Sequence, residues 1–199
     1  MKKLPQILIG AGSLLIIFSV VLFIYIFAPV AKVEINYSLN KPKLTINQIK
    51  PIDKKFGIVI PKIGANAKII EDVDPYNSGI YQMALTKGVA QAKGSAKPDE
   101  VGNMFLFSHS SANLLEAKTY NSVFYLLSKL KKNDEIYIFY KDVKYKYEVS
   151  QIKIVDAKDV SYLSPQSSII NHKSSILTLM TCWPAGTSYK RLLIIAKPK

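Results

Sequence analysis

The sequence of 199 residues predicts a mainly β domain behind one N-terminal transmembrane helix. From residue 56 onward, short runs rich in valine, isoleucine, tyrosine and phenylalanine alternate with glycine, proline, asparagine and aspartate. Such runs are typical of β-strands, and the residues between them are typical of turns. One uncharged segment near the N-terminus is long enough to span a bilayer. One domain with a sizeable core and one appendage is therefore expected.

The N-terminal segment predicts a retained membrane anchor. Residues 7–28 carry no charge and follow Lys2 and Lys3. At about 1.5 Å per residue the segment crosses a hydrocarbon core of about 30 Å, whereas the apolar part of a cleaved signal peptide usually has only about 7–15 residues. Pro29 also occupies the most obvious cleavage position. We expect residues 1–6 in the cytoplasm and a single pass through the cell membrane, with a cleaved signal peptide as the alternative.

Residues 29–55 are expected to form an extracytoplasmic linker. The stretch is polar, contains Pro42 and Pro51, and shows no sustained helical or strand period. It predicts a tether that lifts the folded domain off the bilayer. Docking of residues 46–52 on the domain is the alternative.

The folded domain is expected to occupy residues 56–199 outside the cell. Its strands are predicted at residues 56–60, 67–71, 103–107, 135–140, 143–149, 152–155, 176–180 and 192–196. Residues 81–92 predict a short helical turn followed by a further strand. The run Val-Lys-Tyr-Lys-Tyr-Glu-Val at 143–149 alternates strictly, which predicts a hairpin arm with one solvated face.

One longer helix is predicted within residues 110–132. Val123, Leu126, Leu127 and Leu130 recur there at helical spacing. Residues 156–175 lack such a pattern and are expected to be mostly loop.

The net charge of +13 favours a basic exterior that faces an anionic membrane or wall polymer, with a coding bias toward lysine as the alternative. Lysines are spread over the whole chain, and neither an arginine-rich stripe nor a nucleic-acid motif is present. Nucleic acid is therefore not expected as a partner. Glu71, Asp72 and Asp74 are better explained as a solvated acidic loop than as a cation site, and no metal or cofactor is expected.

The stretch Leu177–Ile195 holds the only cysteine, Cys182, the only tryptophan, Trp183, and the only arginine, Arg191. The apolar runs at its two ends predict two strands. The residues Trp-Pro-Ala-Gly-Thr-Ser between them are typical of a loop. Antiparallel pairing of the two strands would place the thiol and the guanidinium at one rim.

These residue types together suggest acyl transfer. A single cysteine outside the membrane cannot form an internal disulfide. The alternative to a catalytic role for Cys182 is that of a small buried structural residue. His109 follows a predicted strand and can exchange a proton with the thiol, which reacts as the thiolate. Arg191 offers a rigid fork of donors that lysine lacks, and such donors stabilise an oxyanion. His172 lies in a polar loop and is expected to be structural.

The segment Leu177-Thr-Leu-Met-Thr-Cys182 resembles the TLxTC signature of sortases, the cysteine transpeptidases of bacterial surfaces. His109 and Arg191 stand where the sortase histidine and arginine stand relative to this signature. Ile60-Pro-Lys-Ile-Gly64 is similar to the opening strand of the family, and Asp159-Val160 to the approach to its last strands. The resemblance extends over about residues 56–199, and Ser108 replaces the glycine that often precedes the sortase histidine.

The resemblance implies a closed eight-stranded β-barrel with short helices and an active site at one end of a groove. It assigns Cys182 as nucleophile, His109 as general acid and base, and Arg191 as the stabiliser of the substrate or oxyanion. Thr181 is expected to add a hydroxyl or backbone donor to the oxyanion site. Trp183 is expected either to cover the groove or to cap the barrel rim.

The resemblance also implies a substrate class. Sortases cut an LPxTG-like C-terminal sorting signal between threonine and glycine, hold the acyl part as a thioester, and pass it to an amine. The expected partners are surface proteins or pilins that bear this signal, an acceptor amine of a peptidoglycan precursor or pilin subunit, and the lipid bilayer.

The sequence leaves three alternatives to a sortase-like function. An L,D-transpeptidase places its histidine close before its cysteine, whereas His109 and Cys182 lie far apart in this sequence. An anchored β-rich binding module would carry an incidental thiol. A hydrolysing cysteine protease would use the same residues but pass the acyl group to water.

Overall fold

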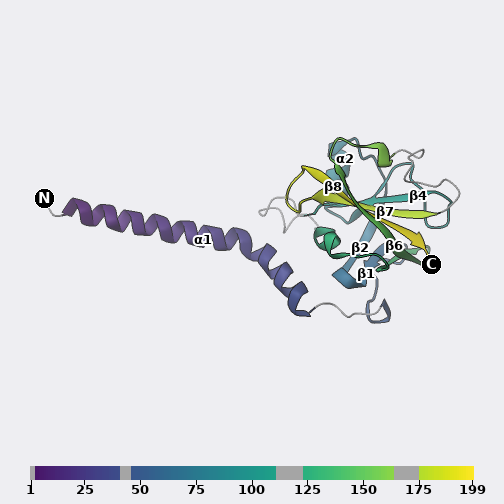
Figure 1. Ribbon diagram of the computed structural model, residues 1–199, viewed down its shortest axis with the longest axis horizontal. Coiled ribbons are helices and arrows are strands. Elements are labelled where there is room, and N and C mark those ends of the chain that lie inside the picture. Colours follow the sequence, from purple (N-terminus) through teal and green to yellow (C-terminus); the bar gives the residue numbers. More distant parts are fainter. Residues whose placement is uncertain (1–2, 41–45, 111–122, 164–174) are drawn as a thin grey trace. The chain divides into compact units, whose positions relative to one another are not determined.

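The computed structural model describes residues 3–40, 46–110, 123–163 and 175–199 (Figure 1). The chain forms two compact units, residues 1–39 and residues 40–199. Helix α1 (Lys3–Asn40) accounts for the first unit and ends at the first residue of the second. Its segment Leu8–Tyr25 is long and apolar enough to cross a membrane. The helix continues through residues 29–40, for which the sequence predicted an irregular tether.

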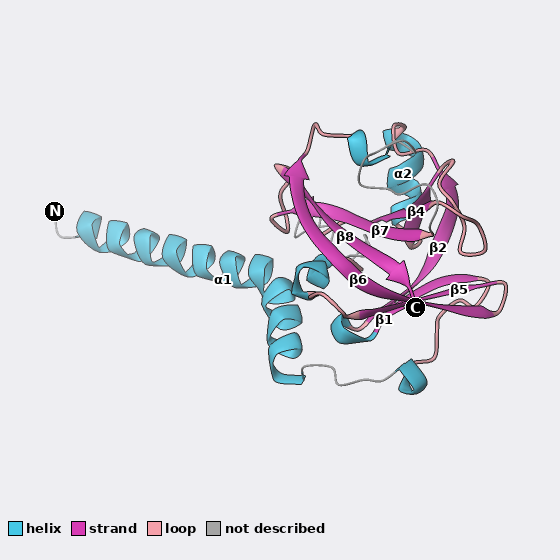
Figure 2. Cartoon of the chain, turned by 45° about the vertical axis from the view of Figure 1, so that its right-hand side comes forward, coloured by secondary structure: helices cyan, strands magenta, loops and turns pink. Residues whose placement is uncertain are grey.

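Eight strands of the second unit close into a barrel (Figures 1 and 2). In chain order they are β1 (Phe56–Ile60), β2 (Ala65–Val73), β3 (Val89–Ala92), β4 (Asn103–Phe107), β5 (Glu135–Tyr140), β6 (Val143–Asp156), β7 (Ile176–Trp183) and β8 (Lys190–Pro198). Around the barrel the order is β1-β2-β3-β4-β7-β8-β6-β5, and β5 pairs with β1. The prediction of a mainly β chain with a closed eight-stranded barrel is therefore confirmed.

Short helices connect the strands. They are η1 (Ile46–Gln48), η2 (Pro61–Ile63), α2 (Ser78–Leu85), η3 (Tyr125–Lys129) and η4 (Ser161–Leu163). The predicted helical turn and strand within residues 81–92 correspond to α2 and β3. Residues 152–155, predicted as a possible separate strand, are the second half of the long strand β6.

Over residues 123–132 the structure has a short 3₁₀-helix instead of the longer helix that was predicted within residues 110–132. Residues 111–122 lie outside the described residues, and residues 125–129 form the 3₁₀-helix η3. Phe124, Leu127 and Leu130, at η3 and its two caps, are the buried residues of this turn and recur every third position. A spacing of three matches the three residues per turn of a 3₁₀-helix.

Residues 46–52 pack on the barrel. Ile46 and Ile49 contact a cluster that contains Tyr137 of β5. The side chain of Asn66 accepts a hydrogen bond from the Ile52 amide at 2.9 Å and donates one to the Lys50 carbonyl oxygen at 2.9 Å. The folded unit therefore includes a segment that the sequence assigned to the linker, as the docking alternative expected.

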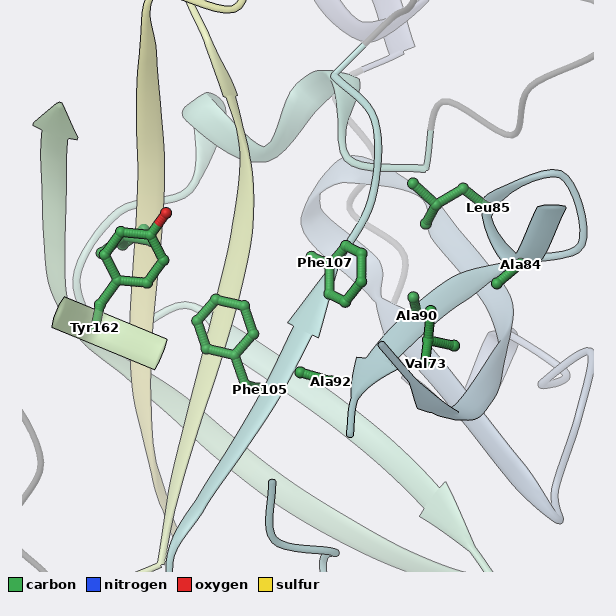
Figure 3. Close-up of a cluster of buried hydrophobic side chains, with 9 residues drawn as sticks. Val73, Ala84, Leu85, Ala90, Ala92, Phe105, Phe107 and Tyr162 are labelled. Atoms are coloured by element: carbon green, nitrogen blue, oxygen red, sulfur yellow. The ribbon is translucent and has the colours of Figure 1, made fainter. Parts of the chain in front are cut away.

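Strand β4 is buried on both faces. Leu106 is fully buried, and its neighbours Phe105 and Phe107 belong to a second apolar cluster together with Leu85 of α2 and Tyr162 of η4 (Figure 3). Burial on both faces explains why the sequence of β4 is a continuous apolar run rather than an alternating one. This second cluster fixes α2 and η4 against β4, and its members Leu85, Phe107 and Tyr162 also line a cleft at the barrel rim.

Candidate active site

Cys182 and Arg191 are directly opposite partners on the antiparallel strands β7 and β8. Opposite residues of an antiparallel pair project from the same face of the sheet. The Cys182 thiol is half-buried. The register therefore brings the thiol and the guanidinium to one rim of the barrel, as the apolar runs on either side of the loop predict.

His109 comes to the same rim because β4 runs parallel to β7. Phe107 of β4 is level with Met180 of β7, and the Ser108 amide donates a hydrogen bond to the Met180 carbonyl oxygen at 3.2 Å. His109 therefore follows β4 at the level where Cys182 stands on β7. The backbone of Ser108 is hydrogen-bonded to β7, and its φ angle is not positive. This position therefore does not require glycine.

A cleft of about 670 Å³ is lined by His109, Cys182 and Arg191 together. Its other walls are formed by α2, the loop between β2 and α2, the region of η4, and the loop between β7 and β8. Thr181 is part of the lining, whereas Trp183 is half-buried at the end of β7 and outside it. A concave, partly apolar cleft with a few convergent polar groups is the usual form of a ligand site.

The Thr181 hydroxyl is engaged within the barrel wall. It donates a hydrogen bond to the Ser108 carbonyl oxygen at 2.9 Å, and Thr181 is buried. In this arrangement the hydroxyl proton is directed to the backbone beside His109 rather than to the cleft. Its contribution is to hold the cysteine strand against the segment that carries the histidine.

The Arg191 guanidinium is fixed on one side and open on the other. Its Nη1 donates to the carbonyl oxygens of Ser188 and Lys190, each at 3.0 Å. Among the described residues these are its hydrogen bonds, so the donors on Nη2 and Nε are open to a ligand. Lysine has a single nitrogen on a flexible stem, so it cannot bond the backbone with one nitrogen and offer other nitrogens to a ligand.

His109 contacts a side chain that the sequence did not single out. Its Nε2 lies 3.0 Å from Oε1 of Gln82 on α2. His109 is half-buried, and both residues line the cleft. A glutamine on a short amphipathic helix gives no signal in the sequence, because the contact depends on how α2 packs beside β4.

The model of the family described as "Sortase domain" matches residues 58–199. This chain belongs to the sortase family. Sortase D of Bacillus subtilis (strain 168) is 32% identical over 141 residues, which are 69% of this chain and 60% of that protein. The chain therefore spans about 60% of the length of this relative.

Solved sortase structures share the fold. A sortase D5 transpeptidase of Clostridium perfringens is 27% identical with a TM-score of 0.57, over 84% of this chain and 92% of that one. Sortase A of Corynebacterium diphtheriae is 27% identical with a TM-score of 0.59, over 76% of this chain and 63% of that one.

Tyr162 is a second residue of this sortase cleft that the sequence did not identify. It lies on η4, within a predicted loop, and stacks on Phe105 with ring centroids 5.8 Å apart. Burial raises the pKa of the Tyr162 phenol, while the positive charge of Arg191 acts in the opposite direction. The phenol therefore stays neutral at physiological pH and presents a polar edge in an apolar wall.

Glu71, Asp72 and Asp74 lie at the end of β2 and in the loop that follows it. Glu71 is ion-paired with Lys97, and this hydrogen bond raises the pKa of the Lys97 amine. Within the described ranges there is no group of three or more histidine, cysteine, aspartate or glutamate side chains with metal-binding geometry. The other histidine of this sortase, His172, lies outside the described residues.

Proposed function

We propose that this sortase is a membrane-anchored cysteine transpeptidase that acts on surface proteins or pilins with an LPxTG-like C-terminal signal. The observation that carries the proposal is the convergence of Cys182, His109 and Arg191 on one cleft. Family membership supports the reaction class. In the proposed topology residues 1–6 are cytoplasmic, residues 7–28 span the membrane, and the barrel lies outside the cell.

In the proposed first step the Cys182 thiolate attacks the threonine carbonyl of the sorting signal. The carbonyl oxygen becomes an oxyanion, which the Nη2 and Nε donors of Arg191, unused by the Nη1 hydrogen bonds, stabilise. The carbon–nitrogen bond to glycine then breaks, and His109 delivers a proton to the leaving amine. The products are a thioester on Cys182 and the released C-terminal fragment.

In the second step an amine attacks the thioester carbonyl. His109 accepts the proton that this amine loses, the carbon–sulfur bond breaks, and the Cys182 thiolate is regenerated. The amine belongs to a peptidoglycan precursor or to another pilin subunit. Water at this step would give hydrolysis instead of transfer.

The test is product analysis with the full chain in detergent, a panel of LPxTG-like peptides, and a glycine-based amine. The proposal predicts a peptide–amine conjugate, which His109→Ala nearly abolishes and His172→Ala preserves. A hydrolysed peptide alone would identify a protease. Peptide binding without cleavage would identify a binding module with an incidental thiol, and either result would overturn the proposal.

A further inference from the structure

We propose that Gln82 is a positioning residue that fixes the ring orientation and the tautomer of His109. The inference rests on the proposed function for the role of His109 as proton carrier, but the contact itself is independent of any substrate. It begins from the 3.0 Å separation between Oε1 of Gln82 and Nε2 of His109. An amide oxygen is an acceptor only, so Nε2 must carry the hydrogen.

Helix α2 is held firmly enough to make this contact specific. Ala84 and Leu85 are buried in the cluster that also contains Phe107. The ring of Tyr81 meets that of Phe107 edge-on, with centroids 6.4 Å apart and an interplanar angle of 75°. Gln82 follows Tyr81, and His109 lies two residues beyond Phe107. The aromatic contact therefore joins the turn of α2 that carries Gln82 to the strand that leads to His109.

The start of α2 is also fixed. The side chain of Asn77 accepts a hydrogen bond from the Ile80 amide at 3.2 Å, which is an N-cap. Capping at one end and burial of Ala84 and Leu85 at the other leave Gln82 little freedom apart from its own side-chain torsions.

The chemistry of the cleft gives this amide a role that a carboxylate often has elsewhere. In enzymes with a nucleophile and a histidine base, a third group commonly orients the base. The described lining of this cleft contains no aspartate or glutamate. The other titratable or charged residues that line the cleft with His109 are Tyr76, Tyr81, Tyr162, Cys182, Tyr189 and Arg191. Oε1 of Gln82 contacts Nε2 of His109 directly, so Gln82 is a group of this orienting kind.

A neutral acceptor has two consequences. The neutral imidazole is the Nε2–H tautomer, and the proton exchanged during the reaction is the one on Nδ1. The hydrogen bond from Nε2 persists when the ring becomes an imidazolium, so the ring does not turn between proton uptake and release. Unlike a carboxylate, the amide oxygen adds no full negative charge that would strongly stabilise the imidazolium.

The experiment uses the full chain in detergent with the His172→Ala substitution, because His109 is then the only histidine. Imidazole NMR shifts report its tautomer and its pKa. We compare the parent with Gln82→Ala, Gln82→Glu and the control Met83→Ala. Met83 is the next residue of α2, is 63% exposed, and is not part of the cleft lining.

We expect the parent and Met83→Ala to hold the Nε2–H tautomer. Gln82→Glu introduces a carboxylate next to the ring and should raise the pKa of His109 by about one unit or more. Gln82→Ala should mix the tautomers and lower turnover about tenfold at nearly unchanged KM, since a poorly aligned base slows the reaction rather than binding. The alkylation of Cys182 by iodoacetamide needs no peptide. The pH dependence of its rate should differ from that of the parent in both Gln82 variants.

An Nδ1–H tautomer in the parent, an unshifted pKa in Gln82→Glu, or a Gln82→Ala protein that reacts like the parent would each overturn the inference. Failure of the proposed function is a separate result: no peptide would react with the parent, while the NMR and alkylation measurements would still decide the role of Gln82.

Discussion

Thr181 joins the strand of the cysteine to the segment of the histidine through the 2.9 Å hydrogen bond from its hydroxyl to the Ser108 carbonyl oxygen. Both residues are buried, and the bond joins β7 to the residue that follows β4, far away in the sequence. The relative placement of Cys182 and His109 therefore depends on a polar contact in the barrel wall as well as on apolar packing.

The first prediction concerns this contact. Thr181→Val keeps the shape of the side chain but removes the donor from a buried carbonyl oxygen. We expect the free energy of unfolding in urea to fall by about 1–2 kcal/mol and turnover to fall with it. Thr181→Ser keeps the hydroxyl and is the matched control. Equal stability and turnover of the two variants would show that the hydrogen bond contributes nothing.

The second prediction separates charge from geometry at Arg191. Arg191→Lys keeps the positive charge but loses the guanidinium fork. In the parent, Nη1 of this fork bonds the carbonyl oxygens of Ser188 and Lys190, and Nη2 and Nε remain as donors for the substrate. The loss of one oxyanion donor typically lowers turnover about a hundredfold or more, and we expect that range from steady-state kinetics. The thermal transition serves as the control for folding, because Arg191 lies near the start of β8. A folded variant with near-normal turnover would reduce Arg191 to a local charge.

The third prediction concerns alkaline stability. Burial raises the pKa of Tyr147 on β6 from 10.0 to about 12, so its phenol stays protonated longer in the folded state than in the unfolded state. The corresponding stability is fully present below pH 10 and is lost as the pH rises toward 12. We expect Tyr147→Phe to escape this loss, which amounts to about 2 kcal/mol.

Thermal melting of the parent and Tyr147→Phe between pH 8 and pH 12 measures the effect, because neutralisation of the many lysines is common to both proteins. Tyr189→Phe, at a side chain that is 76% exposed, is the control and should follow the parent. Parallel curves for the parent and Tyr147→Phe would contradict the assignment.

Contacts between site residues could be predicted where the elements that carry them are neighbours in the chain. The pairing of Cys182 with Arg191 could be predicted because β7 and β8 are consecutive strands joined by a short loop. The position of His109 could be predicted only as a strand end, and the family resemblance supplied its partner. The contact with Gln82 could not be predicted, since it requires the packing of α2 on β4.

Two further differences have physical causes. The spacing of Leu127 and Leu130 fits both helix types, and burial of every third residue selects the 3₁₀ form at η3. Residues 46–52 were included in the predicted tether because the surrounding stretch of residues 29–55 is polar and has no sustained period. Ile46 and Ile49 nevertheless bury apolar surface against β1 and β5, which a count of polar residues does not reveal.

The fourth prediction concerns the proposed topology. If residues 7–28 are an uncleaved anchor with the N-terminus in the cytoplasm, protease added to intact cells should digest the barrel and leave a small N-terminal fragment in the membrane. Immunoblotting with a tag placed before Lys2 detects that fragment. Recovery of a soluble mature protein that begins near residue 30 would contradict the anchor.

The mass of the intact protein after brief exposure to an LPxTG-like peptide tests the central claim most directly. We predict an increase equal to the acyl part of the peptide up to its threonine, located on Cys182 by peptide mapping and removed by an added amine. Cys182→Ala should show no increase under the same conditions. An unchanged mass of the parent across the peptide panel, or an adduct that persists in Cys182→Ala, would contradict the assignment of Cys182 as the nucleophile.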